Sequence, residues 1–172
     1  LAWNGRPLED TQISDAVNRL VFDAEPKSPA GIILEIGKLD EIVGANLPNT
    51  SLPWYLVFAA KGDKLAKYLS ENQSEQLLQK ALRFLTESRD ALPDKSLSPH
   101  ANLATEEANL GIDLSVFAFE KALGIIRGKA MNKSVSSESI LENYESLWLA
   151  RARPGGLAES LGILREALNQ DS

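Results

Sequence analysis

The 172-residue sequence contains no cysteine and a single histidine, His100. Without cysteine the chain forms no disulfide and no thiolate metal site, and one histidine excludes metal centres built from several imidazoles. A lone histidine also leaves few choices for a general base, the group that accepts a proton during catalysis. We therefore expect neither a metal nor any other cofactor.

Positive charge is also scarce, since 18 Lys and Arg residues stand against 24 Asp and Glu residues, for a net charge of −6. Nucleic-acid binding depends on neutralising phosphates, so an acidic chain without a basic stripe is poorly suited to it. The longest apolar run, Leu52 to Ala60, is too short to span a bilayer and contains Pro53. We expect a soluble protein with no nucleic-acid partner and no membrane partner.

Apolar residues recur at spacings of three and four along the chain, which is typical of amphipathic helices, and no β-hairpin pattern is present. The sequence predicts an all-α fold, a single domain over residues 1–172 with about seven antiparallel helices packed around a long central helix. The predicted helices cover residues 12–22, 29–47, 53–69 with a break at 62–63, 70–92, 103–131, 137–153 and 157–168.

The helix predicted over Leu103 to Met131 is apolar on two sides, which indicates that it is buried and central. One stripe holds Leu110, Leu114 and Phe117. The other holds Ile112, Val116, Phe119, Leu123 and Ile126.

Three candidate motifs for chemistry can be set aside. The segment Gly124 to Lys129 has three residues between its glycines, where a phosphate-binding P-loop has four, and Ala130 follows the lysine instead of Ser or Thr. Glu106 and Glu107 are adjacent on a helix and point about 100° apart, so they do not converge on one substrate. We interpret them as acids that favour the dipole of a helix N-terminus. His100 lies in a predicted loop and has no catalytic partner at a recognisable spacing.

Aromatic residues cluster in two places, at Trp54-Tyr55 and at Tyr144 with Trp148. At helical spacings such residues fill a core more often than they contact a ligand. For Trp148 an interface or a sugar-facing position stays open, because tryptophan is enriched where protein interfaces concentrate their energy.

The segment after Trp148 reads as a helix–turn–helix corner. Arg151 and Arg153 suit a helix C-terminus, where cations interact favourably with the dipole. Pro154 ends the helix, and Gly155-Gly156 permits a tight reversal with positive φ. A further interpretation is that Trp148, Arg151 and Arg153 contact a neighbouring domain or a second subunit.

This same segment carries a resemblance to a known family. Residues Tyr144 to Ser160 are similar to a stretch near the C-terminus of bacterial family 20 glycoside hydrolases, the β-N-acetylhexosaminidases and their relatives. The matching residues are Tyr144, Leu147, Trp148, Arg151, Arg153, Pro154, Gly155, Gly156, Leu157 and Ser160. The family often has asparagine between the two arginines, where this chain has Ala152.

The start of the chain also resembles the family. Trp3-Asn4-Gly5 and the later Arg19-Leu20-Val21-Phe22 look like the link that leaves the catalytic barrel. In the family, catalysis belongs to that (β/α)₈ barrel, where an Asp-Glu pair uses the acetamido group of the substrate as the nucleophile. A barrel takes about 200 residues or more, so this chain has no room for one and inherits none of the catalytic residues.

The resemblance implies that the chain is the C-terminal piece of a longer bacterial protein, located in the cytoplasm or the periplasm. It would be a non-catalytic accessory domain that packs on the upstream catalytic barrel, forms a homodimer interface, or does both. The parent protein would be a glycoside hydrolase, and the chain alone would have no catalytic activity. The alternative is an independent helical scaffold or protein-interaction module.

Overall fold

The computed structural model of the chain describes residues 8–22, 29–59, 62–93 and 98–169. Most of these residues are helical and none forms a strand, which confirms the predicted all-α class. The elements are α1 (Asp10–Leu20), α2 (Pro29–Ile36), α3 (Leu39–Val43), α4 (Leu52–Trp54), the π-helical turn η1 (Tyr55–Ala59), α5 (Gly62–Asn72), α6 (Glu75–Asp90), α7 (Pro99–Arg127), α8 (Ser137–Arg151) and α9 (Leu157–Asn169).

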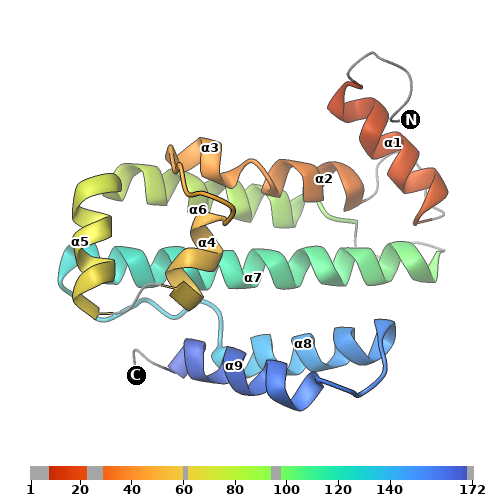
Figure 1. Ribbon diagram of the computed structural model, residues 1–172. Coiled ribbons are helices and arrows are strands. Elements are labelled where there is room, and N and C mark those ends of the chain that lie inside the picture. The colour runs from red at the N-terminus through yellow and green to blue at the C-terminus, as the bar shows by residue number, and fades with distance from the viewer. Residues whose placement is uncertain (1–7, 23–28, 60–61, 94–97, 170–172) are drawn as a thin grey trace.

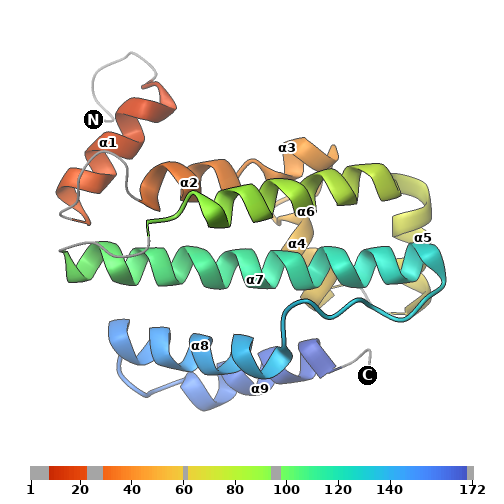
Figure 2. The same cartoon turned by 180° about the vertical axis from the view of Figure 1, so that it is seen from behind.

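The helices form three layers with α7 in the middle (Figures 1 and 2). Helices α2, α3 and α6 lie on one side of α7, and the α8–α9 hairpin lies on the other. Helices α6, α7, α8 and α9 run alternately in opposite directions. Helix α5 lies at the end of the bundle near the C-terminus of α7, and α4 and η1 pack across α7 further from that end. Helix α1 stands apart at one corner and packs on α2.

The long helix α7 is the centre of the domain, as predicted, because ten consecutive residues from Ser115 to Gly124 are buried. The predicted range of this helix, 103–131, lies four residues further along the sequence than the observed one. Ser98 caps the helix by accepting a hydrogen bond from the Ala101 backbone N–H at 3.4 Å, and Pro99 occupies the first turn. Consequently His100 lies in the first helical turn, exposed to solvent, and not in a loop.

Other boundaries were also displaced from the prediction. Ser70 does not begin a helix: α5 continues to Asn72, and Ser74 caps α6 by accepting from the Leu77 N–H at 3.3 Å. The helix predicted over 29–47 is two helices, α2 and α3. Helix α8 begins at residue 137, as predicted, and the Ser136 hydroxyl caps it by accepting from the Ser139 N–H at 3.0 Å.

Two buried polar groups hold the connections between helices. The carboxylate of Glu120 on α7 accepts from the Asn132 side chain at 3.2 Å and the Ser134 backbone N–H at 3.0 Å. These bonds hold the chain between α7 and α8 against the centre of the fold. The buried side chain of Asn18 on α1 accepts from the Ala30 backbone N–H at 3.2 Å and so joins α1 to α2.

Substitution of Phe119 tests whether α7 is central, because the Phe119 side chain is fully buried. We expect Phe119→Ala to lower the free energy of unfolding by about 3–5 kcal/mol, through lost burial and the cavity left behind. Ile163→Ala on α9, where the side chain is 57% exposed, should change it by less than about 0.5 kcal/mol. Denaturant titration measures both, and equal stabilities would show that α7 is peripheral.

Two helical glycines provide a matched pair for stability. A Cβ on Gly162 of α9 would meet no atom within 4 Å, so Gly162→Ala should stabilise the fold by about 0.5–1 kcal/mol through helix propensity. A Cβ on Gly124 would lie 3.1 Å from the Lys129 carbonyl oxygen and 3.2 Å from the Met131 Cα. We expect Gly124→Ala to be less stable than Gly162→Ala by about 1 kcal/mol or more, and thermal melts that rank them otherwise would contradict the packing.

Candidate functional site

The corner between α8 and α9 is built around the indole of Trp148. Its Nε1–H donates to the backbone carbonyl oxygen of Arg153 at 3.0 Å, five residues along the chain. The Ala152 N–H donates to the Trp148 carbonyl oxygen at 2.7 Å and closes the helix. The half-buried Trp148 ring is therefore held in one orientation by the turn that follows it, and the prediction that it fills the core is not met.

The predicted turn residues shape this corner, with two corrections. Helix α8 ends at Arg151, three residues before Pro154, because Ala152 already adopts an extended backbone conformation. Gly156, with φ of 82°, adopts the left-handed conformation, whereas Gly155 does not. A Cβ on Gly156 would lie 3.7 Å from Trp148 Cζ2, so the turn packs closely on the edge of the indole.

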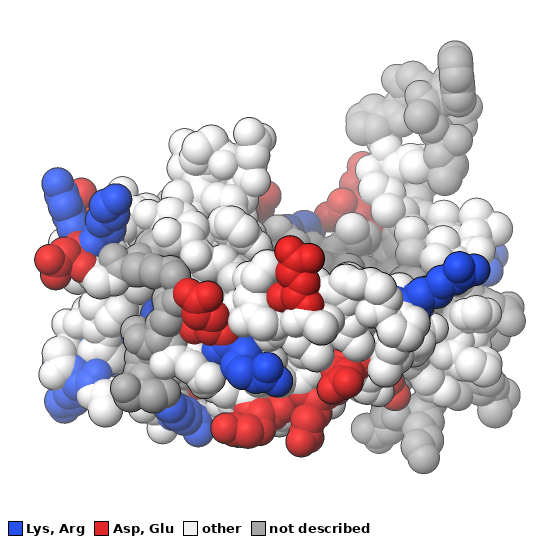
Figure 3. Space-filling view, turned by 60° about the horizontal axis from the view of Figure 1, so that its bottom comes forward, with Lys and Arg blue, Asp and Glu red and all other residues white. Residues whose placement is uncertain are grey.

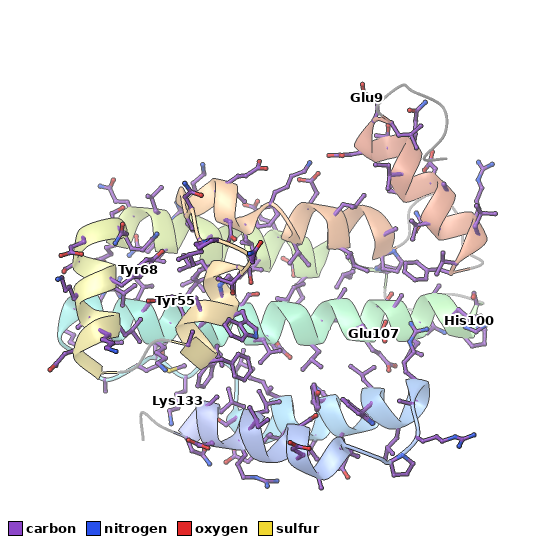
Figure 4. The ribbon with its side chains drawn as sticks, viewed as in Figure 1. Glu9, Tyr55, Tyr68, His100, Glu107 and Lys133 are labelled. Atoms are coloured by element: carbon purple, nitrogen blue, oxygen red, sulfur yellow. The ribbon has the colours of Figure 1, made fainter. Side chains whose placement is uncertain are left out.

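Arg151 forms a bidentate ion pair with Glu107 of the same chain. Its Nε and Nη2 atoms donate to the two carboxylate oxygens of Glu107, each at 2.8 Å. Glu107 lies on the side of α7 that faces α8 (Figure 4). The hydrogen bond to Glu107 raises the pKa of the Arg151 guanidinium, so the guanidinium stays charged. The pair thus joins the end of α8 to α7.

Between α7 and α8 lies an open groove of about 420 Å³. Its wall on α8 is aromatic, since Tyr144 and Trp148 lie one turn apart with ring centroids 5.9 Å from each other. The ion pair of Glu107 with Arg151 closes one end. The lining residues are Glu107, Leu110, Gly111 and Leu114 from α7, and Tyr144, Leu147, Trp148, Arg151 and Ala152 from α8 and its end. We call this cavity the α7–α8 groove.

The structure brings two of the three predicted interface residues together. Trp148 and Arg151 both line the α7–α8 groove, whereas Arg153 does not; it contributes its backbone carbonyl to the corner, and its side chain is exposed. Pro154, Gly155 and Gly156 lie outside the groove and form the turn.

Glu107 is the residue that sequence reasoning missed. It was interpreted as an acid near a helix N-terminus, but α7 begins at Pro99, which places Glu107 beyond the first turn and outside the reach of the dipole. Its partner Arg151 is 44 residues away in the sequence, so no local spacing pattern could indicate the pair.

Two other surface features do not join this site. A polar cavity of about 600 Å³ lies between the end of α6 and the start of α7, and one of its residues, Arg89, is paired with Asp113. Trp54 stacks at a tilt on Phe58 with centroids 5.6 Å apart, and it is 52% exposed. The expectation that Trp54 fills the core is therefore wrong.

Over the described ranges, no group of three or more acidic or histidine side chains converges to hold a metal ion. None of the helices between residues 8 and 169 that the structure describes is both long and apolar enough to cross a membrane. No protein-family model, curated protein or solved structure matches this chain at a significant level.

The Glu107–Arg151 pair can be measured by a double-mutant cycle. Both side chains are more than a third exposed, so we expect Arg151→Ala and Glu107→Ala each to cost about 0.5–1 kcal/mol of unfolding free energy. The double variant should cost little more than either single one. Arg153→Ala, which keeps the carbonyl that Trp148 uses, should change stability by less than about 0.5 kcal/mol. Additive effects of the two partners in urea titrations would show that the pair contributes nothing.

Proposed function

We propose that this chain is a non-catalytic accessory domain of a β-N-acetylhexosaminidase-like glycosidase. The domain docks on the catalytic barrel of the same protein or forms a dimer interface. The observation that supports the proposal is that four of the residues that carry the family resemblance line one open groove: Tyr144, Leu147, Trp148 and Arg151. Most of the others belong to the turn that holds Trp148.

The character of the groove supports docking more than catalysis. Its walls are mainly leucine and aromatic side chains, and both oxygens of its one carboxylate, Glu107, already accept hydrogen bonds from Arg151. Aromatic and arginine side chains are the types enriched at protein interfaces.

The same groove also supports the second candidate, an independent protein-interaction module. The two candidates differ in what precedes the chain in its gene. An upstream segment of about 200 residues or more with an adjacent Asp-Glu pair at a strand end agrees with the accessory domain. A start codon close to the codon for Leu1 contradicts it and favours the independent module. Reading the coding sequence decides between them.

A hydrolysis assay tests whether the domain is catalytic by itself. We expect the purified chain not to hydrolyse an aryl N-acetylglucosaminide above the buffer blank, because the α7–α8 groove holds a single carboxylate, Glu107, where glycoside hydrolysis uses two. The control is the parent protein with its upstream segment, which should be active. Turnover by the isolated chain that persists through repeated purification, and that Glu107→Gln abolishes, would contradict the proposal.

A further inference from the structure

The α7–α8 groove is about as long as two turns of an α-helix. The residues that α8 contributes, from Tyr144 to Arg151, extend over about two helical turns, or roughly 11 Å. Opposite them Gly111 has no side chain, and a Cβ placed on it would meet no atom within 4 Å. The groove therefore has room for an apolar side chain at Gly111.

An acidic row begins beside the aromatic wall of the groove, at Glu145, and continues along α8 beyond the groove toward the start of the helix. Glu145 is three residues from Trp148, and Glu142 and Glu138 continue the row at spacings of three and four, so the three share one side of α8. All three side chains are exposed. Seen from the side that carries α8 and α9, acidic groups predominate over the middle of the surface, and basic groups lie mostly toward its edges (Figure 3).

We propose that the α7–α8 groove binds an amphipathic helix that has apolar residues one turn apart and lysines or arginines along the flank that faces Glu138, Glu142 and Glu145. Such helices bind by laying their apolar face into a hydrophobic groove between other helices. The basic flank complements the acidic row, which fixes the orientation of the helix. This inference takes from the proposed function only that the domain docks on a protein.

A sugar fits the groove less well than a helix does. The hydroxyl groups of a sugar need hydrogen-bond partners along its whole length, and unpaired polar groups in an apolar site weaken binding. In the α7–α8 groove the charged partners are confined to one end, where Glu107 and Arg151 already bind each other. Away from that end the lining side chains are apolar except for the Tyr144 hydroxyl. A helix brings its own paired backbone and needs only apolar contacts there.

Binding of a designed peptide tests the proposal. The probe is a fluorescein-labelled helix of about four turns made of leucine, alanine and lysine, with leucines one turn apart and lysines on one flank. Fluorescence anisotropy should show saturable binding to the whole chain. Gly111→Leu, which fills the groove, should weaken it at least about tenfold. The matched control is Gly162→Leu, which adds the same side chain to a helical glycine with open space on α9 and should bind within about twofold of the parent.

The charged row is tested separately. Replacing Glu138, Glu142 and Glu145 together by glutamine should weaken binding about fivefold or more and reduce its dependence on salt. A peptide of the same composition with scattered leucines, or one with glutamates in place of the lysines, should bind poorly. Equal affinity of these control peptides, or unchanged affinity of a folded Gly111→Leu variant, would overturn the proposal. So would binding of N-acetylglucosamine oligomers in the groove, abolished by Gly111→Leu, without binding of the probe peptide.

The two proposals fail in different experiments. If the gene encodes no upstream barrel, the accessory-domain proposal is wrong, but the peptide-binding result still stands. If the chain does not bind the probe peptide, the helix-binding inference is wrong, whatever the upstream sequence encodes.

Discussion

The fold depends on the burial of α7. Over Ser115 to Gly124 this helix has no solvent-facing side, so other helices must cover it on every side to shield Phe117, Phe119 and Leu123. The same stretch contains the buried charges Glu120 and Lys121, and a buried charge is costly unless it is paired. Glu120 is satisfied by Asn132 and Ser134, which means that the chain leaving α7 must fold back along it before α8 can begin.

The groove follows from how α8 lies on α7. Toward its start α8 is packed closely, and Ile140 is fully buried. Toward its end the two helices are separated by the side chains of Trp148 and Arg151, while α7 offers only a hydrogen atom at Gly111. A glycine inside an otherwise well-formed helix costs roughly 1 kcal/mol relative to alanine. The chain thus retains a weak helix former at the position that keeps the groove open.

Much of the fold could be predicted from the sequence, because burial imposes periodicity. The stripes of Leu157, Leu161, Leu164 and Leu168 predicted α9, and the two stripes over 110–126 predicted the central helix. Boundaries were less accurate where several capping residues compete, as Ser70 and Ser74 do before α6. Pro99 is the first residue of α7, although the segment that contains Pro99 and His100 was predicted to be a loop.

The candidate site could be predicted only in part. Trp148, Arg151 and the turn from Pro154 to Gly156 are close in sequence, so their residue types indicated a corner. The opposite wall comes from α7, more than 30 residues earlier, and nothing in the spacing of Glu107, Leu110 or Gly111 indicates that a groove lies above them. Long-range pairing depends on the packing angle of whole helices, which short patterns do not encode.

The attachment of the α8–α9 hairpin also has a consequence for hydrogen exchange. The hairpin contacts α7 and η1, and its two helices contact each other, so we expect α8 and α9 to open together when the fold opens locally. Backbone amides of α8 and α9 should then exchange with solvent faster than those of α7 around Phe119. A partner seated between α7 and α8 binds only the closed form, so it would slow exchange throughout the hairpin, including in α9, which it does not touch.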